Sequence, residues 1–320
     1  MNVKKVLLLG GSGFVGTYLT NRLSEQGVKV TFPTRRRERT KALIMLPHVN
    51  MVEADINDPA QLEALLAGQD AVINLVGILH SRDVALPYSR DFAQAHVELP
   101  KKIIAACQKT GVKRLLHMSA LHADANGPSE YLRSKGDGEQ AVLNAAGLDV
   151  TVFRPSVLFG LGDSFISTFA TMMKRFPLFP LGFGHARFQP VWVGDVADAF
   201  VAALSDDSTA GKAYDLVGPK VYTLREMVGY AGKLVGSKAR IMPISEGWAY
   251  LQAGLMWLMP KPLMSPDNLR SMEIDSVADS SARLFPGWKP VALEAVAPAY
   301  AAGDNATKHR LDDCRARAGR

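Results

Sequence analysis

The sequence predicts an α/β fold, a doubly wound parallel sheet with a smaller C-terminal lobe. Up to about residue 158, short and almost wholly apolar runs alternate with segments of helical periodicity, which is the pattern of parallel strands connected by helices. The first apolar run also ends in glycines spaced three residues apart. From about residue 160 the composition changes to Phe, Met, Pro and Gly with few strand signals, which indicates an insertion over a pocket.

The first strand, within residues 4–9, leads directly into a glycine-rich turn and a helical segment. In such a unit Gly10 makes the turn, Gly13 lets the backbone approach a pyrophosphate, and Gly16 lets helix and strand pack closely. The helix N-terminus supplies oriented N–H donors. The candidate phosphate-binding residues are therefore Gly10, Ser12, Gly13, Phe14, Val15 and Gly16. A merely tight turn is the alternative, and it is disfavoured because a second strand, 28–32, follows a glycine helix stop.

The second strand is followed by a basic segment, Arg35-Arg36-Arg37. In a dinucleotide fold an acidic residue at this place selects a free ribose 2′-hydroxyl, whereas arginine accommodates a 2′-phosphate. Since no acid stands here, Arg35 and Arg36 predict NADP(H) in preference to NAD(H). The alternative is a solvated basic turn, because Glu38 and Arg39 continue the run of charges.

The remaining elements of the sheet follow in alternation. Asp58-Pro59-Ala60-Gln61 combines an N-cap, a proline at the first helical position and a capping-box Gln. The run 70–78 is almost wholly apolar, which predicts a central strand. Pro100 should kink its helix or mark where the helix begins. The expected order is helix 38–46, strand 50–54, helix 59–68, strand 70–78, helix 91–110, strand 112–118, helix 130–146 and strand 149–154.

Strand signals return near Val191 and Tyr214, on either side of a helical segment. We therefore expect residues 1–158 and about 193–218 to form the dinucleotide-binding domain, and 159–192 with 219–301 to form the smaller lobe. Residues 302–320 are polar, basic and aperiodic, which predicts a mobile tail.

Composition narrows the function classes. The two cysteines, Cys107 and Cys314, support neither a disulfide framework nor a cysteine metal site, so we expect no metal and a reducing cytoplasm. The N-terminus runs straight into the first strand, which does not fit a signal peptide. A net charge of +6 permits contact with anionic lipid or nucleic acid without establishing either, and no nucleic-acid partner is expected.

Two features fall where the reactive end of a nicotinamide would lie, beyond the carboxyl ends of the later strands. Ser119 directly follows a strand, and Tyr131 and Lys135 are four residues apart on one helix face. A lysine ammonium beside a phenol stabilises the phenolate, so the sequence predicts a Tyr131 pKa lowered from about 10 and a proton passed to or from a substrate oxygen. Ser119 could hydrogen-bond the same oxygen, and Lys135 is also expected to contact the cofactor ribose. An exposed helix pair without function is the alternative.

These motifs together resemble the short-chain dehydrogenase/reductase superfamily, in its extended or atypical branch, whose sheet is a Rossmann fold. The resemblance covers roughly residues 1–300. It places Asp55 and Ile56 at the adenine, Pro155 at the cofactor, and four residues beside the cofactor ribose: Asn74, Leu75, Val76 and Gly77. Within the superfamily the chain looks most like the NADPH-binding accessory subunits of respiratory complex I, the NADH:ubiquinone oxidoreductase, and their bacterial relatives. The segments that carry this likeness are 72–77, 116–121, 131–135 and 189–193.

The chain departs from the extended enzymes in two respects. Twelve residues separate Ser119 from Tyr131, so the substrate loop is short, and no Asn of the catalytic tetrad can be matched on the helix 91–110. Three functions therefore stay open: an NADP(H)-binding protein of a respiratory or quinone-handling membrane complex, an active NADP(H)-dependent oxidoreductase on a small or lipid-like carbonyl or quinone, and, with less support, a sugar-nucleotide epimerase or dehydratase. The expected location is cytoplasmic, with the inner face of the membrane as an alternative.

Residues 247–260 contain no charge and end at Pro260. A segment of this length is too short to span a bilayer, which needs about 20 apolar residues. It is therefore either a buried helix of the smaller lobe or, with 262–264, an exposed patch that contacts a membrane surface or a membrane-bound complex. Two Trp and one Tyr in the segment and the basic residues at its flanks, Lys238, Arg240 and Lys261, favour the second interpretation.

Overall fold

The computed structural model describes residues 3–35, 41–259, 262 and 264–302. The chain forms two compact units, and each is built from separate stretches of sequence. Unit 1 comprises residues 1–155, 194–216 and 281–286, and unit 2 comprises 156–193, 217–280 and 287–320. The predicted domains, 1–158 with about 193–218 and 159–192 with 219–301, do not include a return of 281–286 to unit 1. Of the predicted tail 302–320, all but residue 302 lies outside the described residues.

Within the described residues, unit 1 is built on a seven-stranded parallel sheet of order β11-β6-β5-β4-β1-β2-β3. The prediction of a doubly wound parallel sheet is therefore confirmed. Strands β1, β4 and β5 lie at its centre, where their side chains are almost all buried, including the polar residues Asn74, Arg114 and His117. The strands are β1 (Lys5–Leu9), β2 (Lys29–Thr34), β3 (Val49–Glu53), β4 (Ala71–Asn74), β5 (Arg114–Met118), β6 (Asp149–Pro155) and β11 (Lys212–Leu216).

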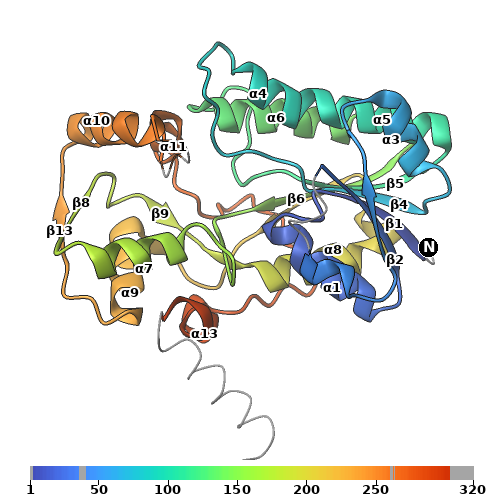
Figure 1. Cartoon of the computed structure of the whole chain (residues 1–320). Helices are drawn as coiled ribbons and strands as arrows, with labels where there is room; N and C mark the ends of the chain where they lie inside the picture. The colour runs from blue at the N-terminus through green and yellow to red at the C-terminus, as the bar shows by residue number, and fades with distance from the viewer. Residues whose placement is uncertain (1–2, 36–40, 260–261, 263, 303–320) are drawn as a thin grey trace, which may run out of the picture. The chain divides into compact units, whose positions relative to one another are not determined.

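Helices cover both faces of this sheet (Figure 1). One face carries α3 (Pro59–Leu66), α5 (Leu99–Thr110) and α6 (Glu130–Leu143), and the other carries α1 (Phe14–Glu25) and α8 (Val193–Leu204). Asp58 caps α3 by accepting from the Ala60 N–H at 2.9 Å, as the sequence predicts. Two short elements complete the unit, α2 (Lys41–Ile44) and a 3₁₀ turn at Asp207–Thr209.

The segment predicted as one helix over 91–110 has three parts. A short α4 (Arg90–Phe92) continues into a π-helix, Ala93–Glu98, and then into α5, with Pro100 in its first turn. Pro100 thus marks where the regular α-helix begins, because its missing N–H costs nothing in the first turn. The wider π turn before it was not predicted from the sequence.

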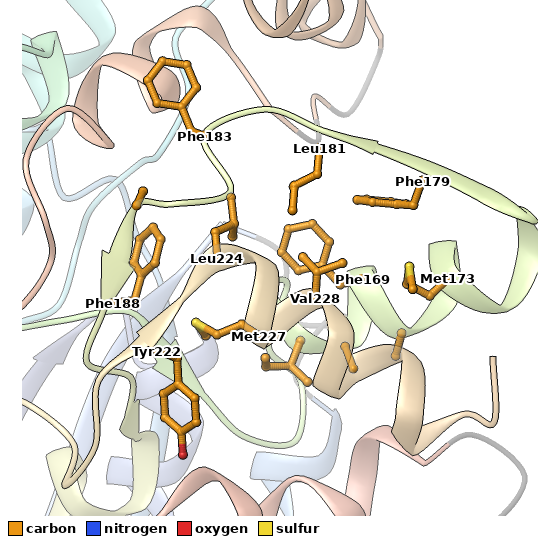
Figure 2. Packing of buried hydrophobic residues seen from close by; sticks show 14 of the residues in the cluster. Phe169, Met173, Phe179, Leu181, Phe183, Phe188, Tyr222, Leu224, Met227 and Val228 are labelled. Atoms are coloured by element: carbon orange, nitrogen blue, oxygen red, sulfur yellow. The ribbon is translucent and has the colours of Figure 1, made fainter. Parts of the chain in front are cut away.

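Unit 2 has its own apolar core, formed where α7 (Ile166–Arg175) packs on α9 (Leu224–Leu234). Figure 2 shows Phe169 and Met173 of α7 facing Met227 and Val228 of α9, with Phe179 and Leu181 beside them. Short strand pairs surround this core: β7 (Leu158–Phe159) with β10 (Val191–Trp192), β9 (Arg187–Phe188) with β12 (Tyr222–Thr223), and β8 (Leu178–Leu181) with β13 (Arg240–Pro243). The other helices are α10 (Glu246–Trp257), α11 (Pro266–Ser271), α12 (Leu293–Val296) and α13 (Pro298–Ala301).

Candidate dinucleotide site

The glycine-rich turn joins β1 to α1, and two of its glycines, Gly11 and Gly16, have no room for a side chain. Gly10 has φ +87°, in the left-handed region that favours glycine. A Cβ on Gly16 would lie 2.2 Å from the Gly10 carbonyl oxygen, so helix and strand could not approach as they do. Ser12 and Gly13 are exposed, and among the described residues no side chain caps α1 and no acid occupies its first turn. Its N–H groups, with Phe14 and Val15 at the first helical positions, therefore suit an anion such as a pyrophosphate.

The next strand ends present polar and basic residues. Arg35 directly follows β2 and is exposed, whereas Arg36 lies outside the described residues. Asp55 is exposed after β3, and its carboxylate accepts from the Asn57 N–H at 2.9 Å. Ile56 is half-buried against the core below the sheet. Asp55 is thus held in a local turn, which fixes the backbone at this strand end.

The segment after β4 is fixed by backbone hydrogen bonds. The Leu75 N–H donates to the Leu9 carbonyl at 2.9 Å, and the Val76 N–H donates to Asn74 Oδ1 at 3.1 Å. Leu75 is buried, Val76 is half-buried and Gly77 is exposed. A Cβ on Gly77 would lie 3.1 Å from Lys135 Nζ, so this backbone passes close to the lysine.

Lys135 reaches the end of β5 from helix α6. Its Nζ donates to the Met118 carbonyl at 3.0 Å, one residue before Ser119. Burial lowers the pKa of Lys135 to about 8, although Glu139 opposes the shift. Ser119 Oγ is buried and has no hydrogen-bond partner among the residues that the structure describes. A buried hydroxyl of this kind is suited to a ligand oxygen.

Tyr131 lies one helical turn before Lys135 and packs edge-on against the rings of Phe92 and His96, with centroid separations of 6.3 and 5.6 Å. Burial raises the pKa of Tyr131 to about 12. The prediction that Lys135 lowers this pKa is therefore wrong for the protein alone, because loss of hydration disfavours the phenolate and dominates the balance. A neutral phenol is suited to donate a proton.

His96 is a site residue that was not predicted from the sequence. It lies on the π-helix, and its Nε2 accepts from the Ile78 N–H at 3.1 Å, which assigns the proton to Nδ1. Nδ1 then donates to Ser134 Oγ at 2.8 Å, and this hydroxyl donates to the Tyr131 carbonyl at 2.9 Å. Burial, with Lys135 and His117 nearby, holds the pKa of His96 well below its usual range. The available signal was a histidine on the otherwise apolar face of the segment 91–110.

His117 on β5 was not predicted as a site residue, and it pairs with Asn74 on β4, which the resemblance places beside the cofactor ribose. They lie opposite each other in the sheet, with Asn74 Nδ2 3.1 Å from His117 Nδ1, and both are buried. Burial lowers the pKa of His117 to about 3, and the nearby Lys135 acts in the same direction. A neutral His117 therefore accepts from the Asn74 amide, while Asn74 Oδ1 orients the Val76 N–H.

The last predicted cofactor residue, Pro155, is buried at the end of β6, and its carbonyl accepts from the Leu121 N–H at 3.0 Å. Beside it Arg154 pairs with Glu139. Within the described residues no group of His, Cys, Asp and Glu side chains could hold a metal ion. The groups of unit 1 therefore fit a nicotinamide dinucleotide. The N–H groups of α1 suit a pyrophosphate, the exposed backbone at Gly77 suits a ribose, and Ser119 and Lys135 lie at the strand end where the nicotinamide would be.

Comparison with known proteins gives the same assignment. The model of the NAD dependent epimerase/dehydratase family matches residues 6–216. The alpha subcomplex subunit 9 of mitochondrial NADH dehydrogenase (ubiquinone) from Arabidopsis thaliana is 32% identical over 87% of this chain and 72% of its own length. The mitochondrial NADH-ubiquinone oxidoreductase 40 kDa subunit of Neurospora crassa is 30% identical over 97% of this chain and 80% of its own length.

Reductases and sugar-nucleotide enzymes are more distant. A ceramide reductase of Caulobacter vibrioides is 24% identical over 75% of this chain and 74% of its own length. The dTDP-glucose 4,6-dehydratase of Streptomyces venezuelae, solved with NAD, shares the fold with a TM-score of 0.64 and 22% identity over 75% of this chain and 84% of its own. By the family model and by the two complex I subunits, the chain belongs to the NAD dependent epimerase/dehydratase family, the extended branch of the short-chain dehydrogenases/reductases.

Proposed function

We propose that this protein binds NADP(H) in the unit 1 site and serves a respiratory or quinone-handling membrane complex. The single observation that supports binding is the open α1 N-terminus above a turn that has no room for a side chain at Gly11 and Gly16. Arg35, exposed at the end of β2, supports the preference for the 2′-phosphate. The likeness to complex I subunits supports the partner, and the location proposed is the cytoplasmic face of the membrane that holds this complex.

The cofactor preference is tested by replacing the two arginines. A charge-assisted hydrogen bond is worth about 1.5–3 kcal/mol, so Arg35→Ala with Arg36→Ala should weaken NADPH binding by about tenfold or more and leave NADH binding nearly unchanged. Fluorescence titration of both cofactors measures this, and Arg90→Ala, another exposed arginine of unit 1, is the matched control. Equal losses for NADPH and NADH would contradict the preference.

Reduction of a small or lipid-like carbonyl or a quinone is the second candidate function. Bound NADPH would supply the hydride. In this proposal Tyr131, which stays protonated because its pKa is raised to about 12, donates the proton to the substrate oxygen. Ser119 holds that oxygen through the buried hydroxyl that has no partner among the described residues. The ceramide reductase relative favours a substrate with a long apolar chain.

Single-turnover mixing of the NADPH-loaded protein with quinones and long-chain ketones separates the two functions. For an active enzyme, Tyr131→Phe should abolish NADPH oxidation while NADPH binding persists, and Lys135→Ala should reduce both. Unchanged oxidation in Tyr131→Phe would remove Tyr131 from the mechanism. No oxidation by the parent protein would leave the cofactor as a structural component of the complex.

A further inference from the structure

The outer face of helix α10 in unit 2 exposes large apolar side chains. On the side that faces the core, Ala249 and Ala253 are buried, Tyr250 packs against Phe183, and a Cβ on Gly182 would lie 2.2 Å from the Ala249 Cβ. The residues that face solvent are large and apolar, and Leu258 is 76% exposed. We define the α10 stripe by its exposed members, Trp248, Leu251, Leu255, Leu258 and Met259.

The α10 stripe is one continuous helical face. Trp248, Leu251, Leu255 and Leu258 are spaced by three, four and three residues, which places them on the same side of an α-helix. No charged residue occurs between Gly247 and Met259. Helices on protein surfaces usually expose charged residues and bury large apolar ones. An exposed apolar face of this kind therefore marks a surface that binds a lipid bilayer or another protein.

Basic residues accompany the stripe. The segments 174–184 and 233–259 contain five Lys and Arg residues and a single acid, Glu246. Four of the basic residues meet at the start of the β8/β13 ribbon, because the Arg240 N–H donates to the Pro177 carbonyl at 3.0 Å and Ser237 Oγ donates to the Met173 carbonyl. They are all exposed: Lys174, Arg175, Lys238 and Arg240. The ribbon leads from these residues to α10 (Figure 1), and Leu178 and Met242 on it are exposed as well.

We propose that the α10 stripe and this basic cluster form a surface that binds an anionic phospholipid bilayer, with α10 lying in the plane of the interface. Within the described residues no helix is long and apolar enough to cross a membrane. The α10 stripe supplies leucines and a tryptophan on one face, and the lysines and arginines lie at the start of the ribbon that leads to it. Together they supply the two attractions of interfacial helices, apolar burial and contact with anionic headgroups.

A second copy of the chain fits this surface less well. A helix of 12 residues is about 18 Å long, and a face about 10 Å wide on it covers only about 200 Å². A stable dimer buries about 800 Å² on each partner. A bilayer sets no such minimum, because each inserted side chain adds to binding by itself. This inference does not rest on the cofactor, so it stands or falls separately from the proposed function.

Flotation of the full-length protein with vesicles tests the proposal. We expect binding to phosphatidylcholine vesicles that contain about one third phosphatidylglycerol, and much weaker binding to phosphatidylcholine alone. Leu251→Glu and Leu255→Glu should each weaken binding by about tenfold or more. Ile274→Glu, an exposed apolar residue of unit 2 outside α10, is the matched control and should leave binding unchanged.

A second pair of variants tests the charges without touching the packing of α10. Lys238→Gln and Arg240→Gln should each weaken binding by about fivefold, an effect that added salt should reduce. An unchanged far-UV circular dichroism spectrum and an unchanged unfolding temperature show that each variant is folded. No binding by the parent, or binding indifferent to the leucine substitutions, overturns the proposal. Self-association in sedimentation velocity that Leu255→Glu abolishes, without vesicle binding, would assign the stripe to a second copy and also overturn it.

Discussion

The protonation state of Lys135 should control the affinity for the cofactor. Its pKa of about 8 lies close to physiological pH, because burial disfavours the ammonium. If the ammonium donates to a bound ribose, NADPH affinity should fall as pH rises through about 8, by about tenfold between pH 7 and 9, since a neutral amine is the weaker donor. Fluorescence titration across this range measures the effect.

Lys135→Met should remove this pH dependence as well as lower the affinity. Lys101→Met, an exposed lysine of the same unit, is the control and should keep the parent profile. If NADPH affinity in Lys135→Met depends on pH as it does in the parent, a group other than Lys135 is responsible for that dependence.

The buried His117 should make the free energy of unfolding fall as pH falls. Its pKa is about 6.5 in the unfolded chain and about 3 in the folded protein, so the unfolded state binds the proton first as pH falls. The stabilisation is fully present above pH 6.5 and is lost progressively toward pH 3, at about 1.4 kcal/mol per pH unit. His117→Gln should therefore show a shallower fall in the free energy of unfolding between pH 6.5 and 4, measured by urea titration.

His96 acts in the same direction as His117, so His96→Gln should also reduce the slope. Replacement of an exposed histidine, His185→Gln, is the control for a general charge effect. A His117→Gln variant that loses stability equally at both pH values would mean that only packing was affected.

At the scale of elements, contact between α6 and the π-helix depends on a missing side chain. A Cβ on Gly138 would lie 1.9 Å from the His96 carbonyl oxygen, and that atom is backbone that cannot turn away. Gly138→Ala should therefore lower the free energy of unfolding by at least about 1–3 kcal/mol. It should also lengthen or break the hydrogen bond from the Ile78 N–H to His96 Nε2. Chemical denaturation measures the first effect.

Gly254→Ala on α10 is the matched control, since nothing lies within 4 Å of the added Cβ. Here a helical alanine should stabilise by about 0.5–1 kcal/mol. Equal changes in the two variants would mean that helix propensity, not contact with the π-helix, explains the Gly138 result.

Sequence patterns predicted the elements that are determined by short stretches of neighbouring residues. Apolar runs predicted the central strands, Asp58 predicted the start of α3, and the glycines predicted the turn at β1. What was missed depends on distant partners: His96 becomes a site residue because Ile78 and Ser134 meet it, and His117 because Asn74 lies opposite. The Tyr131 pKa was predicted in the wrong direction, because burial is decided by the packing of Phe92 and His96 around it.

At the scale of the whole molecule, Arg114 ties unit 1 to its returning segment. Its guanidinium is buried and donates to the carbonyls of Asp149 and Ala203 and to Thr209 Oγ1. Arg114→Met keeps much of the volume but removes these three hydrogen bonds, so the free energy of unfolding should fall by about 1–3 kcal/mol. Urea denaturation measures this. Stability equal to that of the parent would show that water replaces the guanidinium.

The discontinuity of unit 1 has a consequence for synthesis. Strand β6 pairs with β11, but roughly 60 residues of unit 2 and α8 are translated between them, which at about 5–20 residues per second takes roughly 3–12 s. During that interval the nascent sheet ends in an open, largely apolar edge at β6. The growing chain therefore passes through a stage at which a chaperone that recognises exposed strands would find a binding segment, and the completed protein no longer offers it.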